Sequence, residues 1–161
     1  MMRSILGFIA GYITLAVIVM IGFLAGMFIL GVDRVLQPES YDASMLWVLT
    51  ALGITVIAAI AGGIVCQLIA RSRNASIVLA VTLLVLGAAM GFAQPQPTNE
   101  RPARPADQST MEVLKAIKEV GREPLFTRIT NPIGGAIGVL AGALLVKKMK
   151  LRDLDEGLHI P

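Results

Sequence analysis

Side chains that commonly perform catalysis or bind metals are few in this sequence, and they do not cluster. His159 is the only histidine, and Cys66, the only cysteine, lies inside an apolar run. One thiol and one distant imidazole form neither an internal disulfide nor a metal site. The acidic residues within 152–156 form no paired carboxylates, and no phosphate loop, G-x-S-x-G or H-E-x-x-H motif occurs. We therefore predict no catalytic, cofactor-binding or metal site, and a protein that is not an enzyme.

Polar groups inside the apolar runs are uncharged, whereas transporters and proton channels usually carry ionisable residues there. These groups are Tyr12, Thr14, Thr50, Thr55, Cys66, Gln67 and Thr82. Threonine hydroxyls commonly bond the preceding helical turn, so we expect structural roles for them. We expect Gln67, near the end of its run, to bond a neighbouring helix or to reach the membrane interface.

Glycine spacing is the clearest pattern in the sequence. Small residues four apart let helix backbones approach closely in lipid, where hydrophobicity supplies no attraction between helices. The helix-packing positions that we predict are Gly134, Gly138, Gly142, Gly22, Gly26, Gly87, Gly91, Gly62 and Gly63. These rows either close a four-helix bundle from within, or one row faces another subunit. The leading candidate for a subunit contact is the row from Gly134 to Gly142.

These positions lie on four apolar runs that require a membrane. The 161 residues are 55% hydrophobic and 16% charged, with a mean hydropathy of +0.75, whereas a soluble domain is about 25% charged. The runs cover residues 4–32, 45–70, 75–93 and 130–147. They are expected to be helices, because an open sheet cannot satisfy its backbone in lipid. We predict an all-α integral membrane four-helix bundle, forming a single membrane domain over residues 1–161.

The ends of the runs indicate how the chain enters the membrane. The first run exceeds the roughly 7–15 residues of a cleavable signal segment, so we expect it to remain as a span. Lys and Arg divide equally between the two sides, but Arg3, Arg71, Arg73 and the cluster from Lys147 lie directly beside the spans. The positive-inside rule therefore favours cytoplasmic N- and C-termini. The aromatic residues expected at the outer interface are Tyr41, Trp47, Phe92 and Phe126.

The loop over residues 94–129 has two parts. Four prolines within 94–105 predict an extended spacer. Ser109 and Glu112 then have capping-box spacing, and the apolar residues that follow share one helical stripe. We predict a short amphipathic helix over about 110–120, on the outer membrane surface or at the bundle mouth, with packing on its own loop as the alternative. Asn131 and Pro132 resemble an ordinary helix start, and residues 148–161 are expected to form a polar tail.

Several short motifs carry a resemblance to a known group. They are Gly11-Tyr12, Pro38-Glu39-Ser40-Tyr41, Gly62-Gly63-Ile64-Val65-Cys66 with Ala70-Arg71, and Asn131-Pro132 with Gly134-Gly135-Ala136-Ile137-Gly138. In their order, they resemble small uncharacterised bacterial inner-membrane proteins with four spans. The resemblance implies a bacterial inner (cytoplasmic) membrane and a multi-pass topology, and it implies no activity. Small multidrug transporters are similar in size but need a glutamate in the first span, which is lacking here.

Three functions are compatible with this sequence. The leading hypothesis is a non-catalytic membrane protein that acts through helix packing, as an accessory subunit, assembly factor or scaffold. The alternatives are a small oligomeric transporter or channel, and an envelope sensor that uses the outer loop. The expected partners are the lipid bilayer and a second copy of the chain or another membrane protein. Nucleic acid is not expected. The net charge is +3, but the Lys and Arg residues do not form a solvated basic face.

Overall fold

A computed structural model describes residues 2–93, 103–105, 108, 110–121, 124 and 126–157. Its long helices are α1 (Met2–Leu30), α3 (Met45–Ala70), α4 (Arg73–Ala93) and α6 (Thr127–Gly157). Each is long and apolar enough to cross a membrane. The short helices are α2 (Val32–Val35) and α5 (Thr110–Val120). The predicted all-α four-helix bundle is confirmed, and the protein is a multi-pass membrane protein.

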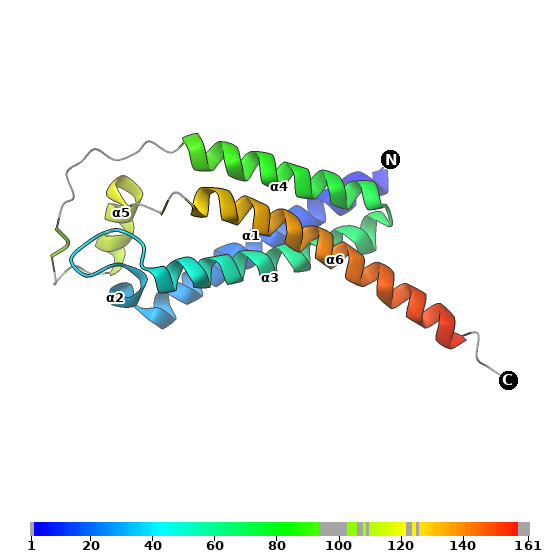
Figure 1. Ribbon diagram of the computed structural model, residues 1–161, viewed down its shortest axis with the longest axis horizontal. Coiled ribbons are helices and arrows are strands. Elements are labelled where there is room, and N and C mark those ends of the chain that lie inside the picture. Colours follow the sequence, from blue (N-terminus) through cyan, green and yellow to red (C-terminus); the bar gives the residue numbers. More distant parts are fainter. Residues whose placement is uncertain are drawn as a thin grey trace.

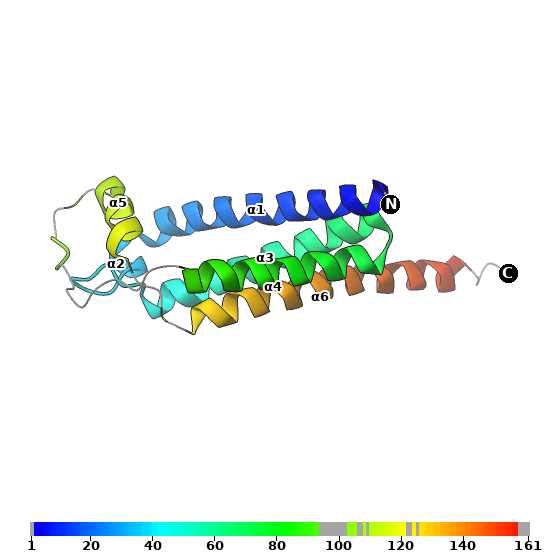
Figure 2. The same cartoon turned by 90° about the horizontal axis from the view of Figure 1, so that it is seen from above.

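The helices are arranged around α3, which packs on α1 along one side and on α6 along the other, while α4 packs on α6 (Figures 1 and 2). Met2 and the last turns of α6 lie at one end of the bundle, here called the termini end (Figure 1). Helices α2 and α5 lie at the opposite end, here called the loop end. Residues 148–157 of the expected polar tail are helical, and they extend α6 beyond the other helices at the termini end.

The first apolar run is interrupted near its end. Helix α1 ends at Leu30, because Gly31 adopts a φ of +73° that residues with a Cβ rarely tolerate. Residues 32–35 then form the single turn of α2. Ser44 caps α3, its Oγ accepting a hydrogen bond from the Trp47 N–H at 3.1 Å. Arg71, in the left-handed conformation, ends α3 and starts the tight turn into α4.

Helix α6 begins earlier than the Asn-Pro pattern indicates. The Thr130 N–H donates to the Phe126 carbonyl at 2.8 Å, and α6 starts at Thr127. Pro132 therefore lies inside the helix, where it has no N–H for the carbonyl of Arg128. Asn-Pro is common at helix starts but also fits a second turn, and the earlier start adds Arg128 to the span.

Two groups of buried side chains hold the bundle together. The group between the long helices consists mainly of small residues: Ala59, Cys66, Ala70, Ala75, Leu79, Ala80 and Val139. The group at the loop end, here called the cap, consists of Val35, Leu36, Tyr41 and Val113, with Ile117 and Trp47 packed against it. The amphipathic helix at 110–120 is confirmed as α5, and its apolar face packs on the first loop at the bundle mouth.

Candidate functional site

The row Gly134, Gly138 and Gly142 faces α3 of the same chain. A Cβ added to Gly138 would lie 2.7 Å from the Ala59 Cβ, and one added to Gly142 would meet the Ile60 carbonyl. Gly134 is less tightly packed, because an added Cβ would be 3.3 Å from the nearest atom, Leu52 Cδ1. Of the two predicted arrangements, the structure has the one in which this row packs inside the bundle, against a helix of the same chain.

The predicted glycines on α1 and α3 lie between helices of the same chain. An added Cβ would be 2.5 Å from Ile54 at Gly22 and 3.1 Å from Trp47 at Gly26, so both glycines of α1 face α3. On α3, a Cβ added to Gly62 would lie 2.7 Å from a backbone carbonyl oxygen of α1, and Gly63 lies against the backbone of α6. Helix α3 thus makes glycine-mediated contacts on two sides.

The two predicted glycines of α4 face α6. An added Cβ would lie 2.9 Å from Pro132 at Gly87 and 3.2 Å from Arg128 at Gly91. The nine predicted glycines therefore line three helix pairs, namely α1 with α3, α3 with α6, and α4 with α6. Among the neighbours nearest to these nine positions, none joins α1 to α4.

Helices α1 and α4 meet where Leu79 of α4 lies 3.1 Å from the Cβ position of Gly11, and they diverge toward the loop end (Figure 1). In Figure 2, α1 lies on one side of the bundle and α4 with α6 on the other. Between α1, α4 and α6 lies a cleft of about 430 Å³. Its walls include Leu15, Val19 and Phe23 of α1, and Leu83, Leu86 and Met90 of α4. This volume falls within the range of about 300–1,000 Å³ of small-molecule sites.

Gly135 of α6 also lines this cleft. It is buried, yet a Cβ built on it would meet no atom within 4 Å. A buried glycine with open space before it is unlike the predicted packing glycines, each of which faces a close neighbour. A side chain at position 135 would therefore extend into the cleft.

Polar side chains line two parts of the cleft. Thr55 lies on α3, and its hydroxyl donates to the Ala51 carbonyl at 2.8 Å, as expected for a helix threonine. Thr127, Arg128 and Asn131 come from the first two turns of α6, at the loop end. The polarity of α6 is thus concentrated at the end of the cleft nearest the membrane interface.

Arg128 is a residue of the cleft lining that the sequence patterns did not indicate. The Asn-Pro motif assigned it to the loop, but the structure places it in the first turn of α6 and in the cleft lining. Its Nε is buried and has no hydrogen-bond partner within the described part of the chain. Among the described residues, the lining includes no acidic side chain, and a guanidinium carries a positive charge. The cleft therefore combines apolar walls with one positive charge at its loop end.

The polar group near the termini end serves helix packing. The Ser76 Oγ of α4 donates to Gln67 Oε1 of α3 at 3.0 Å, and it lies 3.9 Å from Cys66 Sγ. Gln67 thus bonds a neighbouring helix, which was one of the two expectations for it. Cys66 is buried in the same contact.

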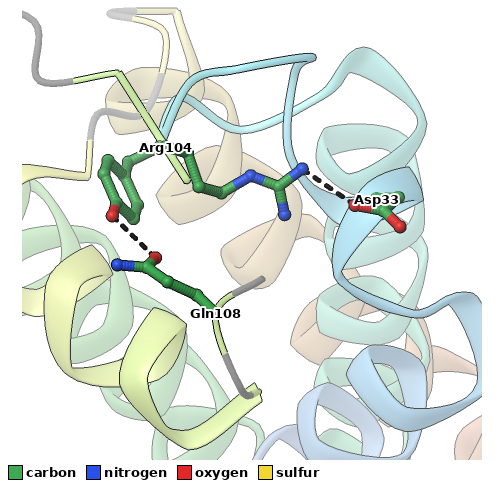
Figure 3. Close-up of polar contacts among 4 residues, drawn as sticks. Asp33, Arg104 and Gln108 are labelled. Atoms are coloured by element: carbon green, nitrogen blue, oxygen red, sulfur yellow. Dashed lines mark hydrogen bonds and ion pairs between the residues drawn. The ribbon is translucent and has the colours of Figure 1, made fainter. Parts of the chain in front are cut away.

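The cap is fastened by contacts between the first and third loops (Figure 3). An Arg104 guanidinium nitrogen donates to Asp33 Oδ1 at 2.8 Å, and the Tyr41 hydroxyl donates to Gln108 Oε1 at 2.8 Å. The Arg104 N–H also donates to the Glu39 carbonyl at 3.1 Å. These bonds hold Arg104 and Gln108 of the third loop beside the first loop.

The four aromatic residues expected at the outer interface differ in their exposure. Tyr41 is 7% exposed and belongs to the cap at the loop end, so its ring packs against protein side chains. Trp47 is half-buried and packs edge-to-face on Phe23, with ring centroids 5.7 Å apart. Phe92 and Phe126 are exposed. The hydrogen bond to Gln108 and the apolar contacts of α5 hold the Tyr41 ring inside the cap.

Among the described residues, no three His, Cys, Asp or Glu side chains lie close enough together to hold a metal ion. The position of His159 lies outside the described residues. No protein-family model, curated protein or solved structure matches the chain. The cleft is accordingly the candidate site, and its geometry carries the functional argument.

Proposed function

We propose that this is a non-catalytic membrane protein that binds another membrane component in the cleft between α1, α4 and α6. By that binding it serves as an accessory subunit, assembly factor or scaffold. The observation that carries the proposal is the separation of α1 from α4 toward the loop end, which leaves a cleft of about 430 Å³ beside otherwise closely packed helices.

The lining supports binding rather than chemistry. Its walls are aliphatic and aromatic, and within the part of the chain that the structure describes they hold neither an acid–base pair nor a nucleophile with a neighbouring base. Apolar pockets with a few polar groups at one place are typical of binding sites. The cleft also opens between transmembrane helices, so its occupant comes from the membrane.

In-cell photo-crosslinking tests this proposal. A photoreactive amino acid at Met90 lies in the cleft lining, whereas one at Val85 lies on the same helix, is also exposed, and is not part of the lining. We expect a discrete adduct from position 90 and none from position 85, with intact-mass measurement of the purified protein as readout. No adduct from position 90, or the same adducts from both positions, would contradict the proposal.

Flux measurements separate this proposal from the transporter alternative. In proteoliposomes that contain the purified protein, we expect no flux of ions or small solutes above that of protein-free vesicles. A flux that Gly135→Leu abolishes and Gly53→Leu leaves unchanged would replace the binding role with transport. Gly53 is the matched position, because it is exposed and an added Cβ there also meets no neighbour.

For the orientation, we propose a bacterial inner membrane with both termini in the cytoplasm. The support is the position of Arg3, Arg71 and Lys147 at the termini end, directly beside the spans. A C-terminal fusion to a fluorescent protein that folds only in the cytoplasm should fluoresce. A dark fusion at normal expression, together with an active periplasmic reporter at the same position, would contradict it.

A further inference from the structure

We propose that the cleft binds an acyl chain of an anionic phospholipid from the leaflet at the loop end, with the lipid phosphate at Arg128. This inference rests on the proposed function, because it names the membrane component that occupies the cleft. It follows from the length of the cleft, the position of its charge and the nature of its walls.

The length of the cleft matches one leaflet. Its α1 wall runs from Tyr12 to Phe23, which is about 16 Å at 1.5 Å per residue. Half of a hydrocarbon core of about 30 Å is about 15 Å. On α4 the lining runs from Leu83, halfway along the helix, to Gly91, two residues before its end, so the cleft covers the loop-end half of that helix, as a single acyl chain covers one leaflet.

The charge lies where a lipid head group lies. Arg128 is in the first turn of α6, at the interface end of the cleft, and its buried Nε has no partner among the described residues. Guanidinium binds phosphate oxygens through paired, charge-assisted hydrogen bonds. Asn131 lies within one turn of Arg128 in the same lining and adds amide hydrogens that a phosphate or glycerol oxygen accepts.

The walls fit a flexible chain better than another helix. Helices that pack closely in lipid use small residues, and the predicted packing glycines of this protein face other pairs of helices. Gly87 and Gly91 of α4 also line the cleft, but they face α6, and the α1 and α4 walls present the large side chains Leu15, Phe23, Leu86 and Met90. An acyl chain adjusts its bends to such a surface and fills the open space at Gly135, whereas a straight helix would meet the large side chains of both walls.

Lipid binding to the purified full chain tests the inference. Native mass spectrometry in a mild non-ionic detergent counts bound lipid as phosphatidylglycerol, which is anionic, or phosphatidylcholine, which has no net charge, is added. We expect the wild type to bind phosphatidylglycerol about tenfold more tightly than phosphatidylcholine, which corresponds to about 1.4 kcal/mol. Glycerol 3-phosphate, a head group without chains, should not compete at equal concentration.

Two pairs of variants separate the charge from the cleft. Arg128→Gln should bring phosphatidylglycerol binding down to the level of phosphatidylcholine. Arg34→Gln, at an exposed position at the loop end outside the lining, should change neither. Gly135→Leu fills the cleft and should weaken binding of both lipids at least tenfold, whereas Gly53→Leu should not. If Gly135→Leu does not fold, Met90→Trp at the exposed rim replaces it.

The outcomes distinguish this inference from the function on which it rests. Unchanged lipid binding in folded Gly135→Leu or Met90→Trp would overturn the inference, as would equal binding of the two lipids by the wild type. A polypeptide adduct from the photoreactive residue at position 90 would also overturn it while leaving the proposed function intact. The absence of any specific adduct from position 90 would remove both.

Discussion

The two sides of α6 illustrate two ways in which membrane helices meet. On the α3 side, Gly138 and Gly142 bring two backbones together so closely that an added Cβ has no space. On the cleft side, Gly135 faces open space although it is buried. A glycine in a transmembrane helix is therefore not by itself evidence of a helix contact. Its meaning depends on what faces it.

The difference between these sides has a physical origin. In lipid, helices associate through dispersion contacts and interhelical hydrogen bonds, and both require close approach. Gly63 permits that approach between α3 and α6, and Gly22 permits it between α1 and α3. Gly87 and Gly91 bring α4 to α6 rather than to α1, and a cleft remains between α1 and α4.

The largest expected effect is at Gly63, where an added side chain would meet the backbone of Val139. Because a backbone in the middle of a packed helix cannot move aside, Gly63→Leu should lower the free energy of unfolding by more than about 3 kcal/mol, above the usual range for overpacking. Gly53→Leu in the same helix is the control. Unfolding in detergent, followed by circular dichroism, measures both, and equal stabilities would show that the α3 and α6 contact is not tight.

A smaller but clear effect is expected at Gly138, whose nearest neighbour is the Ala59 side chain. Gly138→Ile should cost on the order of 1–3 kcal/mol of unfolding free energy, because α6 must shift away from α3 and lose many contacts. Leu140→Ile, at an exposed position of α6, should cost less. A native size measurement adds a second test. If the variant stays fully stable and only a complex dissociates, the row faces a partner.

A still smaller effect on overall stability is expected from the cap, which lies where α1 and α3 meet at the loop end. Val113 is fully buried, and Val113→Asp places a charge among apolar side chains. Protease cleavage of the third loop should become several-fold faster, with little change in the unfolding of the long helices. Met111→Asp, at an exposed position of the same helix, is the control. Equal cleavage of both variants would mean that α5 contributes nothing to closing the loop end.

The smallest effect on stability is expected for Gly135→Leu, which gives the sharpest contrast with Gly63. The leucine enters open space, and replacing glycine in a helix favours folding by up to about 1 kcal/mol. The free energy of unfolding should therefore remain equal or rise slightly, even though the cleft is filled. A loss of more than about 1 kcal/mol would show that both sides of α6 are equally packed.

Much of the fold follows from sequence because its signals are local. Long uncharged runs require helices in lipid, and α5 occupies the residues that the capping box and apolar stripe predict. The sequence also indicated, through the four-residue spacing of glycines, where close contacts are available. It did not indicate the partner of each contact. A helix that is apolar all round has no polar face to show its orientation.

Only the tertiary structure decided the site. The position of Arg128 in the cleft depends on where α6 begins, and the Asn131-Pro132 pair indicated a start one turn later than the observed one. The separation of α1 from α4 depends on which helices pack against the glycines of α3 and α6. Sequence alone determined that four helices cross a membrane, because composition and periodicity are properties of each segment. The structure determined where they leave a cleft, because a cleft is formed by segments far apart in the chain.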